Sequence, residues 1–270
     1  MYFTKINLKL LIHIFFLEKD NACVLLFSDS ASNSVITLSR ERLLVIAPHP
    51  DDEIIGCGGL IQKIKENGGK VYVIFLTNGD TNDFSKSGPS SANERNLEIE
   101  RVAKFLDYDR YHIAFEGNKF HLRLDLLGQK ALIDMIERDS PISIEKVKPT
   151  IVAFPSVNSY NQDHVIAAKA THACLRTSSK EKHFVPTAIS YEFPADFWST
   201  KPESPKNCFL PLTKNEWDKK IEALKLYKSQ WREFPSSRSE KTLTSLATLR
   251  GAESLNDFAE GFYLYRGVLK

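Results

Sequence analysis

Short apolar runs alternate with longer amphipathic stretches along this chain. Apolar runs of strand length lie at residues 43–47, 71–76, 111–115, 150–154 and 188–193. Between and after them, apolar residues recur at helical spacing, which predicts helices over residues 53–67, 92–106, 126–138, 163–175 and 214–231. Strands that alternate with helices are typical of parallel βαβ units. The pattern therefore predicts an α/β fold built on a doubly wound, mostly parallel sheet.

The remaining segments are polar or rich in proline. Residues 83–91 contain a Gly-Pro pair and are predicted to form a mobile loop. The stretch after residue 193 is predicted to be irregular up to the last predicted helix, because it contains Pro194, Trp198, Pro202 and Pro205. No linker divides the chain, so we expect one domain over residues 41–270, preceded by an N-terminal extension, residues 1–40.

The N-terminal extension contains an apolar run at residues 10–17, preceded by Lys5 and Lys9. This charge order resembles that of a signal peptide, but the run is interrupted by His13 and no small-residue cleavage site follows. It is also shorter than the roughly 20 apolar residues of a membrane span. We expect a cytoplasmic protein without a membrane span, in which this run adds a strand or helix to the domain. A signal peptide or membrane anchor is the alternative.

Charge and cysteine content indicate which partners and which cellular compartment to expect. The chain has 270 residues, and its 36 basic and 34 acidic residues leave a net charge of +2, which gives no reason to expect nucleic acid as a partner. Four widely separated cysteines form no C-x-x-C pair, so we expect no disulfide framework and a reducing compartment; they are Cys23, Cys57, Cys174 and Cys208. Composition leaves open whether the protein is a homo-oligomer.

The first apolar run leads directly into a cluster of titratable residues. His49 lies between two prolines, and Asp51, Asp52 and Glu53 follow at once. Ligands of parallel sheets bind beyond the carboxyl ends of the strands, and imidazole together with carboxylate suits zinc or a similar divalent ion. One aspartate can share the ion with His49 while the other faces its water, but spacing does not tell the two aspartates apart. The alternative is a surface turn whose acidic residues cap the next helix.

A catalytic zinc site needs three protein ligands and one open position. His164 is the best candidate for the third ligand, because it follows the predicted strand 150–154 and begins a helix, and strand ends converge at one edge of a parallel sheet. The other histidines lie inside a predicted strand or helix or follow no clear strand end: His13, His112, His121, His172 and His183.

The sequence APHPDDEIIGCGG, residues 47–59, resembles the A-H-P-D-D-E signature of the LmbE-like, or PIG-L-like, N-deacetylases. These are zinc enzymes that remove acetyl groups from N-acetylglucosamine-containing compounds. The resemblance implies a Rossmann-like fold, one zinc ion per chain held by His49 and Asp52, and Asp51 as the general base. It also implies a small N-acetylated sugar or glycoconjugate as substrate.

The sequence NSYNQDHVIAAKA, residues 158–170, resembles the second motif of this family, H-x-D-H followed by alanines. The resemblance implies that His164 is the third ligand and that Asp163 supports the ligand set. Many members carry a further histidine three residues before this ligand, and here that residue is Asn161. An amide can donate a hydrogen bond to an oxyanion but cannot carry a proton in turnover. We therefore expect Asp51 to protonate the leaving amine as well.

Further segments extend the resemblance to about residues 41–266. ERNLEIERVAKFLDYD resembles the R-x-x-E helix of the family, which implies that Arg95 and Glu98 lie near the site, where the guanidinium can hold a phosphate or sugar oxygen. The alternative is a surface ion pair. KIEALKLYKSQW and LRGAESLNDFAEGFYLYR resemble the patterns A-L-x-x-Y-x-S-Q and R-G-x-x-x-G-x-x-x-A-E-x-F, for which core packing is the alternative to a direct role.

The sequence thus favours metal-dependent removal of an N-acetyl group from an N-acetylglucosaminyl-type sugar. One alternative is another metal-dependent hydrolase on the same scaffold, such as a phosphoesterase. A second is a protein that binds metal and sugar but has lost turnover, for which Asn161 is the supporting feature.

Overall fold

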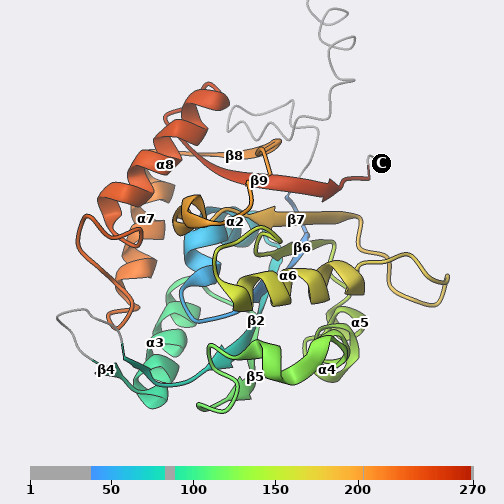
Figure 1. Cartoon of the computed structure of the whole chain (residues 1–270). Helices are drawn as coiled ribbons and strands as arrows, with labels where there is room; N and C mark the ends of the chain where they lie inside the picture. Colours follow the sequence, from blue (N-terminus) through green and yellow to red (C-terminus); the bar gives the residue numbers. More distant parts are fainter. Residues whose placement is uncertain (1–37, 83–88, 203, 269–270) are drawn as a thin grey trace, which may run out of the picture.

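The computed structural model describes residues 38–82, 89–202 and 204–268 of the chain. Its main sheet has seven strands in the order β5-β2-β1-β6-β7-β9-β8 (Figure 1). The strands are β1 (Arg42–Ala47), β2 (Lys70–Asn78), β5 (Arg110–Glu116), β6 (Ile151–Phe154), β7 (Thr187–Tyr191), β8 (Cys208–Leu212) and β9 (Phe258–Arg266). The first five in that order are parallel, and β9 pairs antiparallel with both of its neighbours. A separate two-stranded ribbon joins β3 (Thr81–Asn82) to β4 (Pro89–Ser90).

Helices cover both faces of the main sheet. They are α2 (Asp52–Glu66), α3 (Ala92–Phe105), α4 (Gly128–Asp134), α5 (Ile144–Val147), α6 (Gln162–Cys174), α7 (Lys214–Lys225) and α8 (Glu240–Glu253). Leu43 and Val45 of β1 pack on the face covered by α2, α3, α7 and α8, whereas Leu44 and Ile46 pack on the face covered by α4, α5 and α6. Successive side chains of a strand point to opposite faces, so a run that is apolar throughout marks a strand buried on both sides. The predicted single-domain α/β fold is confirmed.

The predicted elements differ from the observed ones mainly in the last third of the chain. The final predicted helix ends at Lys225 rather than near residue 231, because the residues after it turn toward α2 and α3. The irregular segment predicted after residue 193 contains β8, an edge strand in which Pro211 obscures the strand pattern. We predicted neither α8 nor β9. The helix predicted over 126–138 is a 3-10 turn, α4 and a π turn in succession.

The predictions for residues 1–37 and 83–88 lie outside the described residues, whereas residues 89–90 of the loop predicted over 83–91 form β4. Among the described cysteines, Cys57 and Cys174 are free, and these two and Cys208 are buried. Within the described ranges, no helix combines the length and the apolar composition needed to cross a bilayer.

The chain changes direction across the sheet at β1. From β1 it passes through α2 to β2 and through α3 to β5, all on one side, and it then returns to β6 on the other side of β1. Such a reversal opens a crevice beyond the carboxyl ends of the two central strands, and ligands of doubly wound sheets bind there. His49 follows β1, and His164 lies in the first turn of α6, which follows β6.

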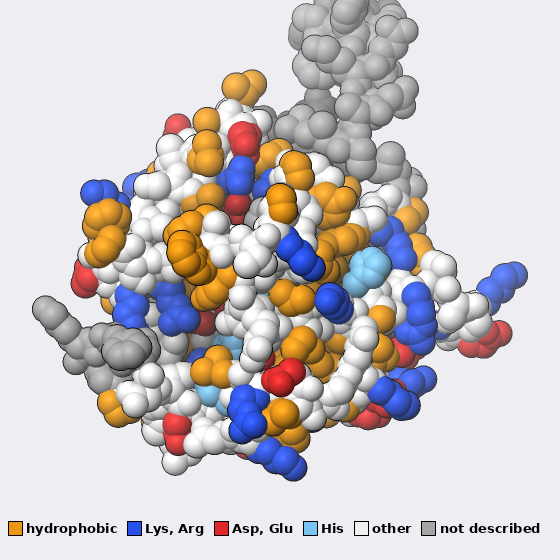
Figure 2. All heavy atoms as spheres, in the orientation of Figure 1, with side chains coloured by type: hydrophobic (Ala, Val, Ile, Leu, Met, Phe, Trp, Pro, Cys, Tyr) orange, Lys and Arg blue, Asp and Glu red, His pale blue; other side chains and the backbone are white. Residues whose placement is uncertain are grey.

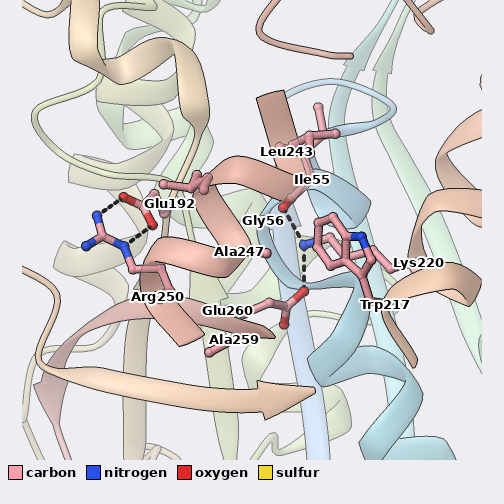
Figure 3. A pocket seen from close by; sticks show the side chains of 12 residues that line it. Ile55, Gly56, Glu192, Trp217, Lys220, Leu243, Ala247, Arg250, Ala259 and Glu260 are labelled. Atoms are coloured by element: carbon pink, nitrogen blue, oxygen red, sulfur yellow. Dashed lines mark hydrogen bonds and ion pairs between the residues drawn. The ribbon is translucent and has the colours of Figure 1, made fainter. Parts of the chain in front are cut away.

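The helix that follows β1 is kinked at Cys57, whose φ of −148° and ψ of 28° are not helical. A buried ion pair from distant elements satisfies the backbone groups freed by the kink. Lys220 of α7 donates to the carbonyl oxygen of Ile55 at 2.8 Å and lies 2.7 Å from Glu260 of β9 (Figure 3). The Glu260 carboxylate accepts hydrogen bonds from the backbone N–H groups of Gly59 at 2.7 Å and Leu60 at 2.9 Å.

The cavity around this ion pair is small. Its volume is about 20 Å³, which is room for about one water molecule and too little for a substrate. Gly56 lies at its wall, and a Cβ added there would be 2.3 Å from the ring of Tyr191. This part of α2 is therefore packed too closely against β7 for a larger residue. The contacts fix the first turn of α2, which carries the acidic cluster.

Candidate metal centre

Three side chains converge at the crevice between β1 and β6. Asp52 Oδ2 lies 3.4 Å from His49 Nδ1 and 3.2 Å from His164 Nε2. The three atoms lie within 4.8 Å of one another, and each of the three residues is buried. Two imidazole nitrogens and one carboxylate oxygen form a donor set that suits a catalytic zinc ion with one open position. The residues that the sequence proposed as ligands therefore fit a divalent ion.

The backbone between β1 and α2 holds this geometry. The N–H of His49 donates to Asp52 Oδ2 at 2.8 Å, and the carbonyl oxygen of Pro48 accepts from the N–H of Thr77 at 3.0 Å. Asp51 has a φ of 107°, in the left-handed region that residues other than glycine rarely adopt. Such a conformation costs of order 1–3 kcal/mol and is concentrated at functional sites. The turn thus separates the directions of two adjacent carboxylates.

Asp51 is buried beside the three converging side chains, and its Oδ2 has no hydrogen-bond partner in the described structure. The positively charged side chain of Arg238 pairs with it, and Arg238 Nε lies 3.5 Å from Oδ2. Burial raises the pKa of Asp51 to about 6, while the charge of Arg238 opposes the rise. The arrangement leaves an oxygen of Asp51 able to accept a proton.

Asp163 orients one of the imidazoles. Its Oδ2 lies 3.0 Å from His49 Nε2, and its Oδ1 accepts a hydrogen bond from the N–H of Leu124 at 3.0 Å. Burial alone would lower the pKa of His49, but the hydrogen bonds to Asp163 and Asp52 raise it to about 9. A carboxylate behind a ligating imidazole fixes its tautomer and leaves the other nitrogen for a metal. Asp163 thus supports His49 rather than its sequence neighbour His164.

Sequence reasoning missed His121, which is buried against the edge of the His49 ring with ring centroids 5.5 Å apart. Its Nε2 lies 3.0 Å from an Nη1 of Arg95, and its Nδ1 lies 3.3 Å from the hydroxyl of Thr77. Burial and the charge of Arg95 lower the pKa of His121 to about 3, so the ring is neutral at pH 7. No local pattern marks this position, because His121 lies in a turn after β5.

Arg95 and Glu98 of α3 are both buried, so the alternative of a surface ion pair is wrong. Arg95 donates to the carbonyl oxygens of Pro50 at 3.3 Å and Gly79 at 3.4 Å. Glu98 accepts from both the N–H and the hydroxyl of Ser229, at 2.8 Å and 2.6 Å. These contacts brace the loops around the site. Contact of Arg95 and Glu98 with a sugar stays a prediction.

Asn161 is the N-cap of α6, where its Oδ1 accepts a hydrogen bond from the N–H of Asp163 at 2.9 Å. The side-chain oxygen therefore caps the start of α6, and the amide nitrogen is the donor that this side chain can still offer. A histidine at this position, as the resemblance to the family motif implies, would supply a titrating group, and Asn161 does not.

The segment that matches A-L-x-x-Y-x-S-Q packs in the core and also contacts the site through Tyr227. The hydroxyl of Tyr227 donates to Glu53 at 2.6 Å, and that of Tyr108 donates to the same carboxylate at 3.2 Å. Glu53 in turn accepts from the N–H of Asp51 at 3.2 Å. Burial raises the pKa of Glu53 to about 8. The third acidic residue of the cluster therefore anchors the turn that carries Asp51.

Part of this region is open to solvent. Figure 2 shows pale-blue histidine side chains in a hollow of the surface, with blue lysine or arginine side chains along its edge. Arg238 is one partly exposed residue here, with 30% of its side chain accessible. The Arg238 side chain therefore lies between the buried Asp51 carboxylate and solvent.

Comparison with known proteins gives a family and several relatives. Residues 44–175 match the family described as PIG-L, GlcNAc-PI de-N-acetylase. The uncharacterized deacetylase YaiS of Escherichia coli (strain K12) is 26% identical over 192 residues, which cover 70% of this chain and 92% of YaiS. The diacetylchitobiose deacetylase of Thermococcus kodakarensis is 24% identical over 248 residues, or 84% of each chain. The structure of N,N'-diacetylchitobiose deacetylase from Pyrococcus horikoshii superposes with a TM-score of 0.65 at 20% identity, covering 84% of each chain.

Proposed function

We propose that this chain, which belongs to the PIG-L family through residues 44–175, hydrolyses the N-acetyl group of an N-acetylglucosaminyl-type sugar or glycoconjugate with the help of one bound zinc ion. One observation carries the proposal. The ligating atoms of His49, Asp52 and His164 lie within 4.8 Å of one another, and the buried carboxylate of Asp51 lies beside them. The deacetylases among the relatives support the choice of reaction.

Some residues of the site would bind the zinc ion, and Asp51 would transfer protons. His49, Asp52 and His164 would hold the zinc ion, which when bound lowers the pKa of water from 15.7 to roughly 7 and polarises a carbonyl group. Asp163 keeps the His49 ring in the tautomer that leaves Nδ1 for the ion. Asp51 takes a proton from the water that attacks the acetyl carbon. Its Oδ2 accepts no hydrogen bond among the described residues and can therefore take this proton.

The proton then has to reach the leaving amine. Asn161 cannot supply it, because an amide does not titrate in the relevant range. Asp51 has taken a proton from the attacking water and can pass it to the amine. Burial raises the pKa of Asp51 to about 6. We therefore assign both proton transfers to Asp51, with Asn161 limited to donating a hydrogen bond through its amide nitrogen.

The substrate proposal is a small sugar bearing an acetylated amine. The printed names of the relatives include diacetylchitobiose deacetylases, and the family description names an N-acetylglucosaminyl lipid. These share an N-acetylglucosamine unit, which is the part that the site would have to recognise. Arg95 and Glu98 are proposed to contact the sugar, and a cytoplasmic location without nucleic acid as a partner remains part of the proposal.

Acetate release from a panel of substrates tests the function. The full chain, freed of metal and reloaded with zinc, would be incubated with N-acetylglucosamine, diacetylchitobiose and N-acetylglucosaminyl-phosphatidylinositol. Acetate formed only by the zinc-loaded protein supports the proposal. Release of phosphate from p-nitrophenyl phosphate without acetate would favour another metal-dependent hydrolase. Sugar binding without any product would favour a protein that has lost turnover.

A further inference from the structure

A positively charged side chain contacts the carboxylate that the proposed function makes the general base. Arg238 Nε lies 3.5 Å from Asp51 Oδ2. The side chain of Arg238 is 30% exposed, whereas that of Asp51 is 2% exposed. The guanidinium thus approaches the buried base from the solvent side, which is the side from which a substrate has to arrive.

A chain of hydrogen bonds, buried except for the partly buried bond to Arg238 itself, fixes this guanidinium. Arg238 Nη1 donates to Gln230 Oε1 at 3.0 Å, and Gln230 Nε2 donates to the hydroxyl of Ser229 at 3.1 Å. Ser229 donates from its hydroxyl and its N–H to Glu98. Gln230, Ser229 and Glu98 are 4%, 6% and 1% exposed, so water competes little for these bonds. The chain therefore runs from α3 to Arg238 and ends at Asp51.

We propose that Arg238 is a catalytic residue that donates hydrogen bonds to the oxyanion formed when water adds to the acetyl carbonyl. Gln230, Ser229 and Glu98 are the positioning residues that hold it there. The inference rests on the proposed function. Donors and charges already in place where negative charge develops are usually the largest single contribution to catalysis, and Arg238 would supply both. It also compensates for Asn161, a neutral amide at the position of a titrating histidine.

Proximity makes the contact feasible. Asp51 has to reach the attacking water, and that water bonds to the carbon that carries the oxyanion. A group in contact with Asp51 is therefore close to the reacting carbonyl. The guanidinium presents several N–H donors in a planar fork, and it keeps its charge throughout the working range of pH.

The reaction balances without a proton from Arg238. The water oxygen forms a bond to the acetyl carbon, the carbonyl electron pair moves onto the oxygen, and Asp51 takes a proton from the water. The pair then returns, the carbon–nitrogen bond breaks, and the proton passes from Asp51 to the amine. The products are acetate and the free amino sugar. Arg238 stabilises charge and neither gains nor loses a proton.

Kinetics of Arg238 variants give the first test, with zinc content measured on each preparation. Arg238→Ala is expected to lower kcat by about 10²–10³ while KM and zinc content stay unchanged. Added guanidinium chloride, kept below the onset of unfolding, should restore part of the activity of this variant. Lys228→Ala is the matched control, because Lys228 is an exposed cation in the same segment. Wild-type kcat in Arg238→Ala, or an equal loss in the control, would overturn the inference.

Gln230 tests the positioning chain. Gln230→Leu removes the acceptor for Arg238 and is expected to lower kcat without changing KM. Gln230→Glu keeps an oxygen for the guanidinium and should recover most of the loss. A purely structural role would instead lower the melting temperature of both variants and affect kcat and KM together. If Gln230→Leu kept the wild-type kcat, the assignment of Gln230 would fail.

A binding measurement tests, without turnover, whether Arg238 binds a tetrahedral anion. Methylphosphonate is a tetrahedral anion shaped like the adduct of water with an acetyl group, and acetamide is a neutral control of similar size. By calorimetry on zinc-loaded protein, Arg238→Ala should bind methylphosphonate about 10–100-fold more weakly, the effect of one lost charge-assisted hydrogen bond, and acetamide equally well. Equal methylphosphonate affinities would overturn the inference. Wild type that releases no acetate from any substrate, yet shows this difference, would overturn deacetylation and keep Arg238 as the anion-binding residue.

Discussion

Asp51 and Asp52 are adjacent in the chain but have opposite environments. Asp52 Oδ2 lies against two imidazoles and accepts from the N–H of His49, whereas Asp51 Oδ2 has no hydrogen-bond partner among the described residues. Burial acts to raise the pKa of both carboxyls, but the neighbouring His164 and His49 lower that of Asp52 far below its usual range. The left-handed backbone of Asp51 produces this separation. It supports one aspartate as a ligand and the other as a base.

Exchanging each aspartate for asparagine separates the two roles. Asp51→Asn should keep the zinc ion while lowering kcat by about 10²–10⁴, the usual effect of a lost general base. Asp52→Asn should weaken zinc binding, because a neutral amide replaces an anionic ligand. Zinc titration and acetate release measure the two effects. Metal loss from Asp51→Asn together with full occupancy of Asp52→Asn would reverse the assignment.

Removing either imidazole should release the ion. His49→Ala and His164→Ala each leave two of the three ligands, so elemental analysis after dialysis should find well below one zinc per chain. His172→Ala is the matched control, because this histidine is exposed on α6, the helix that also carries His164. Wild-type occupancy in both ligand variants would mean that other residues hold the metal.

Asn161 has two separable contributions, the cap of α6 and an amide donor. Asn161→Ala should lower kcat by at most about 10²–10³, the effect of one oxyanion donor, and should reduce stability by about 0.5–2 kcal/mol through the lost cap. Asn161→Asp would keep a capping oxygen and remove the amide donor. An unchanged kcat in both variants would leave Asn161 with a structural role alone.

Adding a histidine at the same position tests the departure from the family motif. Asn161→His introduces a group that titrates near neutrality, and it should change the pH dependence of kcat. Profiles of acetate release from pH 5 to 9 would be compared with those of wild type. Identical profiles would mean that the new imidazole does not reach the reacting groups. Activity in this variant with an inert wild type would favour a binding protein that has lost turnover.

At the scale of elements, the kink in α2 depends on a buried ion pair from two other elements. Lys220 and Glu260 are 4% and 3% exposed, and between them they satisfy a carbonyl group and two N–H groups of α2. Removing one partner of a buried pair leaves an uncompensated charge, which costs far more than the loss of an exposed pair. The C-terminal third of the chain therefore stabilises the helix whose first turn carries Asp52.

This contrast predicts unequal effects of two lysine variants of α7. Lys220→Met should lower the free energy of unfolding by about 3–5 kcal/mol, because Glu260 is left buried without its partner. Lys214→Met removes an exposed ion pair with Asp218 and should stay within about 1 kcal/mol of wild type. Urea unfolding followed by circular dichroism measures both. Similar values for the two variants would contradict the role given to the buried pair.

At the scale of the whole molecule, the part that matches the family profile is not the whole of the folded unit. Residues 44–175 contain the proposed ligands, but Tyr191, Tyr227 and Glu260 pack against or hydrogen-bond α2 and the acidic cluster from outside that range. The core on the α2 face of the sheet also includes residues of β7 to β9 and of α7 and α8. The site is therefore completed by chain that lies far beyond the second motif.

A chain that ends at residue 175 should for this reason fail to form a cooperatively folded domain. It would expose the apolar side of α2 and leave the backbone groups at the kink without partners. Near-ultraviolet circular dichroism and urea unfolding, compared with the full chain, measure this. A sharp unfolding transition and stoichiometric zinc in the shortened chain would contradict it.

The sequence by itself determined the class of the fold and the proposed ligands. An unbroken apolar run has to be buried on both faces, so the five predicted strands and most of the helices between them followed from local pattern alone. Parallel strands bring their carboxyl ends to one edge, which is why His49 and His164 could be paired across more than a hundred residues. The roles of the two adjacent aspartates came from the resemblance, because spacing does not encode direction.

Only the tertiary structure decided what surrounds those ligands. His121, Arg238 and the pair of Tyr227 with Glu53 meet the site through contacts between distant segments, and such contacts leave no local period in the sequence. The antiparallel strand β9 went unpredicted for a related reason, since its burial depends on its place between β7 and β8. Local pattern fixes which residues must be buried. Long-range packing decides which polar groups are buried together. It thereby decides their hydrogen-bond partners and their pKa values.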